Sequence, residues 1–450
     1  MRLLRINQVV ERIQDPSFAL QIIQVIRFAA VFLVSVLLVK VGVSNSTIGS
    51  YEYVLFIASI LTGVWTNGVF QSFLLQSGGQ ESNRRLLLFR RYSIFVFVLS
   101  FILFLAIYFC GDFFIQLLGF NELPRGFYFF IGFHFVFHGS YLVALKYFLE
   151  GKVFKMYCFG LSFFFSYLVV FSLFAIEGIE LYQVFQVLAV VGGLYFLFWI
   201  REYKLHVDLR RFQNVKIHFK GFSVLLFIQA IAALSLWSDS WWVQYFYGNG
   251  EAFALFRYGA REFPLFIILN AAFGTAMLGY LSSDKEMGMA RIKKGSRRFI
   301  YSFGILYVLL MIFSNTLYKS FYSADYIQSS VIFDMYLTIV VVRVIFPRSV
   351  LIGHKLYVGL IVISLMELGL NLFLSYYLHE IFGVSGLIFA TVLAHFIEMV
   401  VMVIYLKMVK GIRGRDYAPL GEFTGFVIFV IVIFVTKYLV HGFDKLAINF

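Results

Sequence analysis

Charged residues are scarce in this sequence: they make up 14% of its 450 residues, against roughly a quarter in soluble globular domains. Hydrophobic residues make up 61%. A water-soluble protein of this composition would expose apolar patches large enough to drive association, whereas lipid solvates such surfaces in a polytopic membrane protein. The composition therefore excludes a soluble globular protein and indicates an integral membrane protein.

Cysteine is nearly absent, and the sequence holds no nucleotide loop. Cys110 and Cys158, the two cysteines, lie in apolar runs without pairing or metal-ligand spacing, so we interpret them as packing residues. His134 and His138 are four residues apart without a third ligand at a suitable offset, so we expect no metal and no resident cofactor. No P-loop motif occurs, so any energy that the protein uses must come from an ion gradient or from consumption of substrate on the far side.

Long apolar runs dominate the chain instead. A transmembrane helix needs about 20 residues to cross roughly 30 Å of hydrocarbon, and these runs are continuous rather than alternating, which excludes a closed β-barrel. We therefore predict an all-α polytopic membrane protein whose first hydrophobic segment is retained, because no signal-peptide pattern precedes it. The thirteen expected crossings are residues 19–43, 52–76, 92–110, 126–148, 156–176, 181–200, 222–246, 252–280, 299–317, 327–350, 357–378, 383–406 and 423–441.

The distribution of lysine and arginine predicts the orientation. With a cytoplasmic N-terminus, the cytoplasmic segments hold 28 of these residues, and the outer connections hold three, Lys40, Arg125 and Lys319. The positive-inside rule requires this asymmetry, and it supports each of the first twelve crossings. It also accounts for the net charge of +13, so no nucleic acid is expected as a partner.

Similar features recur in the two halves of the chain. Asn45 and Asn249, Gly151 and Gly353, and Gly178 and Gly383 are separated by 204, 202 and 205 residues. Offsets this close predict two six-helix halves in parallel repeat, as in repeat-built transporters, which bind near the repeat interface. We expect an N-terminal lobe over 1–200, a cytoplasmic linker over 201–221, a C-terminal lobe over 222–410 and an extra C-terminal transmembrane segment over 411–450.

Four stretches carry a resemblance to a known family: "VSNSTIGSYEYVLFIASI" (43–60), "YFLEGKVFKMY" (147–157), "LSLWSDSWWVQYFYGNGEAFALFRYGAREFPLF" (234–266) and "FGVSGLIFATVLAHFIEMVVMVIYLKM" (382–408). In these stretches and their order, the chain resembles the polysaccharide flippases of the multidrug/oligosaccharidyl-lipid/polysaccharide exporter superfamily. The resemblance covers roughly residues 18–410. The thirteenth predicted helix departs from the twelve or fourteen helices that are common in the superfamily.

The resemblance implies a transporter of the bacterial plasma (inner) membrane that serves cell-surface polysaccharide biosynthesis, such as that of the O-antigen of lipopolysaccharide. In this family, two six-helix lobes face each other around a central cavity. A lipid-linked oligosaccharide is turned over by alternating access, usually coupled to an ion gradient. The implied partners are a polyprenyl-diphosphate-linked glycan, membrane lipids and glycan polymerase or assembly proteins. A self-contained cavity between two lobes is expected to work as a monomer.

Two arginines interrupt the apolar run at 252–280: Arg257 and Arg261. They share one helix face, about 6 Å apart along the axis, and a charge deep in a bilayer costs at least about 2.5–3.5 kcal/mol unless it faces protein or water. Guanidinium groups make paired hydrogen bonds to phosphate oxygens. We therefore predict that Arg257, Arg261 and Arg27 of the first helix bind the carrier diphosphate. The alternative is that Arg257, near the outer end, snorkels to the headgroups.

Acidic residues within the predicted crossings are rare. Asp239 lies well inside the seventh helix, and Glu262 follows Arg261 in the eighth. A carboxylate within the membrane is a candidate for H⁺ or Na⁺ coupling, and the alternative is an ion pair with Arg257 or Arg261; adjacent residues such as Arg261 and Glu262 do not pair directly. Interhelix hydrogen bonding is the expected role of Glu367, His395 and Glu398.

Three classes of function are compatible with these features. A flippase for a polyprenyl-diphosphate-linked oligosaccharide is favoured. A drug or metabolite exporter of the same superfamily is the second, although a cationic cavity repels cationic drugs. A polytopic glycosyltransferase, polymerase or ligase is the third. No outer turn offers an acid/base pair with room to work, so we expect no catalytic residue and no enzyme.

Overall fold

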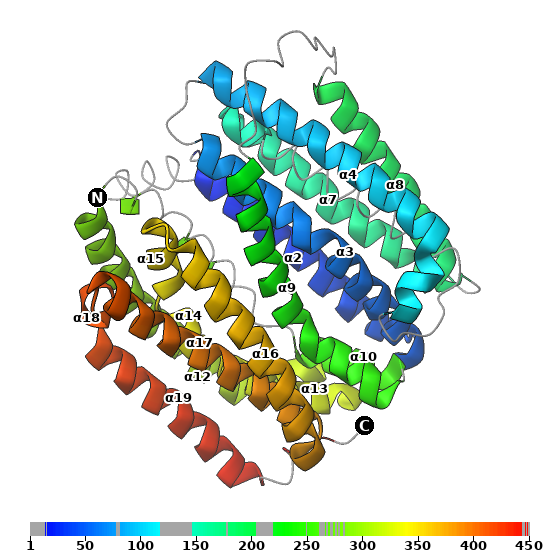
Figure 1. The fold of residues 1–450 in the computed structure, drawn as a ribbon. Coiled ribbons are helices and arrows are strands. Elements are labelled where there is room, and N and C mark those ends of the chain that lie inside the picture. Colours follow the sequence, from blue (N-terminus) through cyan, green and yellow to red (C-terminus); the bar gives the residue numbers. More distant parts are fainter. Residues whose placement is uncertain are drawn as a thin grey trace, which may run out of the picture. The chain divides into compact units, whose positions relative to one another are not determined.

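The computed structural model describes residues 16–77, 82–117, 146–176, 179–203, 219–248, 250–260 and 284–442, with isolated positions at 14, 266–281, 446 and 448. None of the described residues forms a β-strand, and helices account for nearly all of them (Figure 1). This confirms the all-α prediction. The chain divides into two compact units, Met1–Ala230 and Ile231–Phe450, and the division falls within helix α9 (Phe219–Tyr247).

The first unit is built from long helices: α2 (Pro16–Lys40), α3 (Asn45–Ser77), α4 (Ser82–Leu117), α7 (Val153–Ser172), the 3₁₀ helix η1 (Leu173–Ala175), α8 (Leu181–Tyr203) and the beginning of α9. Helices α2 and α7 pack closely at Gly160, where the absence of a side chain allows the approach. A Cβ atom at this position would lie only 3.2 Å from Ile23. Tyr51 of α3 is fully buried, and its hydroxyl lies 3.2 Å from that of Tyr167 on α7. Aromatic side chains therefore join α3 to α7.

The second unit contains the end of α9 followed by α10 (Gly250–Gly259), α12 (Lys285–Phe321), η3 (Ala324–Tyr326), α13 (Ile327–Leu337), α14 (Val340–Arg343), α15 (Pro347–Gly353), α16 (Tyr357–Phe382), α17 (Val384–Lys410), α18 (Gly414–Tyr417) and α19 (Leu420–His441). Helices α16 and α17 lie side by side (Figure 1). Glycine forms the turn between them: Gly383 has a φ of 59°, and a Cβ atom at Gly386 would lie 2.0 Å from the carbonyl oxygen of Leu378.

Six described helices are long and apolar enough to cross a membrane, and a bent pair would make seven. The six are Arg84–Gly111, Val153–Ala175, Lys285–Phe321, Tyr357–Phe382, Val384–Lys410 and Leu420–Val440. The last of these corresponds to the crossing expected at 423–441. The crossing expected at 126–148 falls almost entirely outside the described residues, as do His134, His138 and most of the predicted linker.

The crossing expected at 327–350 differs from the prediction, because it is not one continuous helix. Its two parts, Ala324–Leu337 and Val340–Gly353, are bent by 44°. A second interruption lies within the later part, at Pro347. Proline lacks a backbone N–H and disfavours helical geometry in the residue before it, and Phe346 has φ −126° and ψ 51°. The chain therefore restarts as α15 at Pro347, and the following residue, Arg348, lies 3.1 Å from Glu398 of α17.

Helix α19 is tied to the second unit by a buried charge pair. Lys437 of α19 donates a hydrogen bond to the carboxylate of Asp334 on α13, and further ones of 2.7 Å to Ser314 Oγ and to the Met311 carbonyl. The Tyr438 hydroxyl donates to the same carboxylate at 2.9 Å. Asp334 is fully buried, so these contacts supply the compensation that a carboxylate needs in an apolar environment.

Candidate functional site

The carboxylate of Asp239 is held inside the second unit by hydroxyl groups. Asp239 lies on α9 and is only 4% exposed. Thr391 Oγ1 of α17 donates to Oδ1 at 2.6 Å, the Tyr336 hydroxyl of α13 donates to Oδ2, and Ser238 Oγ lies 3.4 Å from Oδ1. Among the described residues, the hydrogen-bond partners of Asp239 are hydroxyl groups. These residues do not show the alternative that was considered for Asp239, an ion pair with Arg257.

The amide of Asn371 on α16 completes this arrangement. Its Nδ2 donates to Thr391 Oγ1 at 3.1 Å, and its Oδ1 accepts from Ser238 Oγ at 3.1 Å and from Ser375 Oγ at 3.2 Å. We name Asp239, Ser238, Asn371, Thr391 and Tyr336 the Asp239 cluster. It offers one negative charge and several oxygen atoms from four helices, which is the ligand chemistry of hard cations such as the alkali and alkaline-earth ions.

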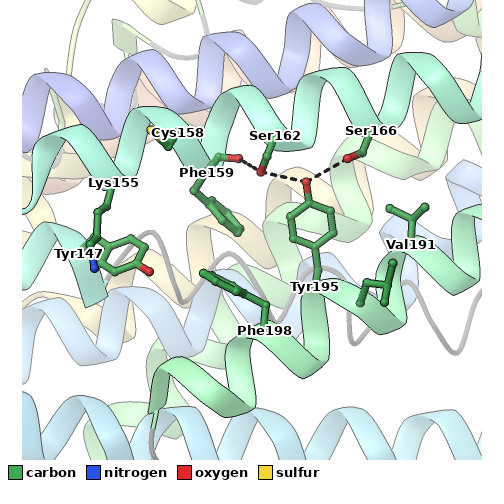
Figure 2. A pocket seen from close by; sticks show the side chains of 10 residues that line it. Tyr147, Lys155, Cys158, Phe159, Ser162, Ser166, Val191, Tyr195 and Phe198 are labelled. Carbon is green, nitrogen blue, oxygen red and sulfur yellow. Dashed lines mark hydrogen bonds between the residues drawn. The ribbon is translucent and has the colours of Figure 1, made fainter.

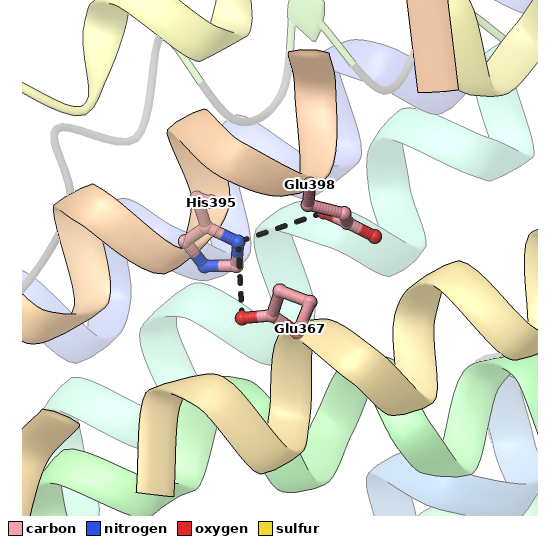
Figure 3. Close-up of side chains that lie close together, drawn as sticks. All are labelled: Glu367, His395 and Glu398. Atoms are coloured by element: carbon pink, nitrogen blue, oxygen red, sulfur yellow. Dashed lines mark ion pairs between the residues drawn. The ribbon is translucent and has the colours of Figure 1, made fainter. Parts of the chain in front are cut away.

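A second group of polar side chains lies one turn further along the same helices (Figure 3). His395 Nδ1 of α17 is 3.4 Å from Oε1 of Glu367 on α16 and 3.8 Å from Oε2 of Glu398. Arg348 of α15 lies 3.1 Å from the other oxygen of Glu398. We name Glu367, His395, Glu398 and Arg348 the acid–histidine cluster. The expected interhelix bonding of its carboxylates and histidine is confirmed.

Helical spacing explains why the two clusters are neighbours. On α17, Thr391 and His395 are four residues apart, and on α16 the same spacing separates Asn371 from Glu367. Residues four apart share a helix face, about 6 Å apart along the axis. On α9, Ser235 Oγ donates to Glu367 Oε1 at 2.7 Å, whereas Ser238 and Asp239 belong to the other cluster. Each of the three helices thus contributes to both clusters.

Arg257 lies next to the Asp239 cluster. It is the last charged residue of α10, and its guanidinium Nη1 lies 3.3 Å from Ser240 Oγ, on the residue that follows Asp239. Helix α10 is fixed against α13, because Ser329 Oγ donates to the Leu255 carbonyl at 2.7 Å. The predicted partners Arg261 and Glu262 lie outside the described residues.

Arg27 belongs to the first unit. It lies on α2, half-buried, with its guanidinium 5.2 Å from the centre of the Phe163 ring on α7. An aromatic face at this distance attracts a cation and leaves the guanidinium edge for hydrogen bonds. Its predicted role in diphosphate binding stays a prediction.

A pocket of about 620 Å³ opens between α7 and α8 of the first unit (Figure 2). Phe159, Phe198 and Leu194 make much of its lining apolar, and Lys155 lies at one end. The Tyr195 hydroxyl lies 2.9 Å from Ser162 Oγ and 3.1 Å from Ser166 Oγ. These three hydroxyl groups thus bond to one another, and the pocket presents a mainly apolar surface with the exposed ammonium group of Lys155.

Sequence reasoning missed the neutral members of the Asp239 cluster and the pair of Asp334 with Lys437. The available signal was polar residues at helical spacing within apolar runs: 364, 367, 371 and 375 on α16, and 391, 395 and 398 on α17. Such a stripe faces protein rather than lipid. The rotation of each helix about its axis decides which polar stripes face each other. The sequence of a single helix does not determine that rotation.

Comparisons with known proteins agree with this fold. No protein-family model and no curated protein matches the chain. Among solved structures, the lipid II flippase MurJ in an inward closed conformation matches with a TM-score of 0.65 and 16% identity, over 94% of this chain and 92% of that one. A mutant of the Vibrio cholerae MATE transporter VcmN matches with a TM-score of 0.58 and 14% identity, over 90% of this chain and 96% of that one.

A transporter of the MOP superfamily from Pyrococcus furiosus gives a TM-score of 0.56 at 14% identity, over 88% of this chain and 96% of that one. At such identities the likeness concerns the fold. The chain shares its fold with these flippases and transporters, as the sequence resemblance predicted, and the protein is an integral membrane protein.

Proposed function

We propose that the protein is a flippase that moves a polyprenyl-diphosphate-linked oligosaccharide from the cytoplasmic to the outer leaflet of a bacterial inner membrane, for cell-surface polysaccharide biosynthesis. The observation that carries this proposal is the fold shared with a lipid II flippase over 94% of the chain, combined with arginines inside predicted crossings. A lipid-linked substrate with a diphosphate requires cationic groups at membrane depth, and guanidinium is suited to phosphate oxygens.

Arg257 is the first candidate for diphosphate binding. It is half-buried on α10 beside Ser240, and its charge lies close to the anionic Asp239 cluster. A diphosphate bound at Arg257 would therefore interact with a cation held at Asp239, which gives a physical route for coupling. Arg261 and Arg27 are further candidates for diphosphate binding, and an alanine variant at each position tests its role.

The driving ion is proposed to bind at Asp239. Na⁺ fits the oxygen atoms of Asp239, Asn371 and Thr391, because hard cations prefer oxygen ligands; H⁺ is the other coupling ion to test. The Tyr336 hydroxyl, which also touches Asp239, belongs to the bent helix. Discontinuous helices are a common place for ion and substrate binding in transporters, and their parts move during alternating access.

Binding of polyprenyl diphosphate to purified protein tests the arginine site. Native mass spectrometry would compare the wild type with Arg257→Ala and Arg257→Lys. Removing a charged hydrogen-bond donor costs about 1.5–3 kcal/mol, so Arg257→Ala is expected to weaken binding by roughly tenfold or more, with partial recovery in the lysine variant. Arg297→Ala is the matched control, because that guanidinium pairs with Glu422 at 2.7 Å and is 54% exposed.

The diphosphate site is refuted if alanine at positions 27, 257 and 261, singly and together, leaves binding at the wild-type level. A drug or metabolite exporter is then the second candidate, and the likeness to MATE transporters favours it. In that case a soluble substrate rather than a lipid-linked glycan would protect the protein against thermal unfolding.

A further inference from the structure

With both glutamates ionised, the formal charge of the acid–histidine cluster does not balance while His395 is neutral. Glu367 and Glu398 bring two negative charges, and Arg348 brings one positive charge. The side chains of Glu367 and Glu398 are only 3% and 12% exposed, and an uncompensated buried charge is strongly unfavourable. A protonated imidazole would bring the sum to zero, and Nδ1 of His395 already faces both carboxylates.

No other described residue that faces the cluster supplies this missing charge through a contact in the structure. The charged residues on the helices packed against α17 are Glu367 and Glu380 on α16, Arg348 on α15, Lys220 and Asp239 on α9, Asp334 on α13 and Arg343 on α14. Glu380 and Lys220 lie more than three helical turns from Glu367 and Ser235 along their helices. Asp239 is bound by hydroxyls, and Asp334 is paired with Lys437. His395 is therefore the residue placed to complete the charge of the cluster.

We propose that the acid–histidine cluster is a proton-binding site, in which His395 carries one proton between Glu367 and Glu398, separate from the cation site at Asp239. With Nδ1–H directed at Glu367, the incoming proton binds at Nε2, which is buried and has no hydrogen-bond partner among the described residues. The step transfers one proton from water to the imidazole and back, and no other bond changes.

The bent helix connects the two sites. Tyr336 lies before the bend and donates to Asp239, whereas Arg348 lies after it and pairs with Glu398. Ser364 Oγ also lies between Arg348 and Glu398, at 2.8 and 3.1 Å. The positive charge that this proton gives the imidazole attracts Glu398 through Nδ1–H in competition with Arg348, and thereby weakens the contact that holds the second half of the bent helix. Occupancy of either site is thus expected to bias the same bend.

A metal ion is the competing occupant, since ligand atoms of Glu367, His395 and Glu398 lie within 4.8 Å of one another. The surroundings oppose it. Arg348 brings a fixed positive charge to Glu398, and Ser235 already donates to the Glu367 oxygen that faces His395. A divalent ion would have to displace both contacts, whereas a proton needs neither to move.

Nuclear magnetic resonance of the full-length protein in nanodiscs, labelled with ¹³C at histidine Cε1, measures the proton directly. The His395 signal is assigned by its loss in His395→Gln. It is expected to change from the neutral to the protonated shift as the pH is lowered. Glu367 brings the opposite charge beside the imidazole, so Glu367→Gln is expected to move the midpoint of this change to lower pH.

Glu422→Gln is the matched control, because Glu422 pairs with Arg297 at the exposed start of α19, and its midpoint should equal that of the wild type. Where Glu367→Gln does not fold, Glu398→Gln provides the same comparison. An imidazole signal that stays at the neutral shift while the protein remains folded overturns the proposal. An unchanged midpoint in both glutamine variants does so as well, and so does micromolar Zn²⁺ that abolishes the titration through a tight, stoichiometric complex.

The role of this proton in transport rests on the proposed function, but its binding does not. In liposomes, His395→Gln is expected to remove the response of transport to an imposed pH gradient while the response to Na⁺ remains. Absence of transport in the wild type would count against the proposed function alone, since the resonance still reports whether His395 binds a proton. A transport rate whose pH response is unchanged in His395→Gln would refute the coupling role.

Discussion

Thr391 donates a hydrogen bond of 2.6 Å to the carboxylate of Asp239, and this contact joins α17 to α9 inside the second unit. The hydroxyl also accepts from Asn371, so a single threonine links three helices around one buried charge. A buried carboxylate needs compensation for its negative charge. Either hydroxyl donors or a bound cation can provide it. The proposed ion site therefore predicts that the Asp239 cluster responds to ion concentration.

Replacing Asp239 by asparagine keeps the shape of the side chain and removes its charge. We expect Asp239→Asn to lose Na⁺ binding by tenfold or more, because the only formal charge of the cluster is lost, while the protein still folds and inserts. Binding of ²²Na⁺ to purified protein measures this. Asp325→Asn is the control, since Asp325 is an exposed residue of η3. Equal Na⁺ binding in wild type and Asp239→Asn would remove this cluster from the ion pathway.

Lys437→Ala should destabilise the protein strongly. It leaves the buried carboxylate of Asp334 without its cation, and breaking a buried pair from one side costs about 3–5 kcal/mol. The midpoint of thermal unfolding in detergent is expected to fall clearly, and Asp334→Asn added to Lys437→Met should restore much of it. Lys319→Ala, at an exposed position near the end of α12, provides the control. A stable Lys437→Ala protein would show that the pair does not hold α19.

Gly386→Ala tests the close approach at the turn between α16 and α17. Its Cβ atom would meet the Leu378 carbonyl oxygen at 2.0 Å, and forced overpacking costs about 1–3 kcal/mol. Since this oxygen belongs to the backbone, the helices must separate, and both clusters lie on them. Gly425→Ala on α19 is the matched change, because a Cβ atom there meets nothing within 4 Å. Equal unfolding midpoints for the two variants would contradict this packing.

Much of the fold follows from the sequence because long apolar runs have few alternatives in lipid. The expected crossings at 357–378 and 383–406 became α16 (Tyr357–Phe382) and α17 (Val384–Lys410). Asp239 was identifiable as well, since a lone carboxylate in an apolar run must be compensated. The length of an apolar run and the presence of a charge within it are properties of a single segment. Both can therefore be identified from the sequence alone.

The contacts between segments were not predictable in the same way. Arg348 lies at the end of the crossing expected at 327–350, and the restart of the helix at Pro347 brings it to Glu398. Tyr336 and Thr391 resemble many other hydroxyl-bearing residues of these helices, and only helix rotation selects them as partners of Asp239. A bend of 44° changes which residues face inward, and the apolar pattern carries no signal of its size.

Movement of a lipid-linked glycan across a membrane tests the central claim most directly. Purified protein would be reconstituted into liposomes with a polyprenyl-diphosphate oligosaccharide, and an impermeant glycan-cleaving enzyme would measure its transfer between leaflets under imposed Na⁺ and pH gradients. We predict protein-dependent transfer in the wild type and in Arg297→Ala, and its loss in Arg257→Ala. No transfer by the wild-type protein with any of several glycans and gradients would contradict the flippase assignment.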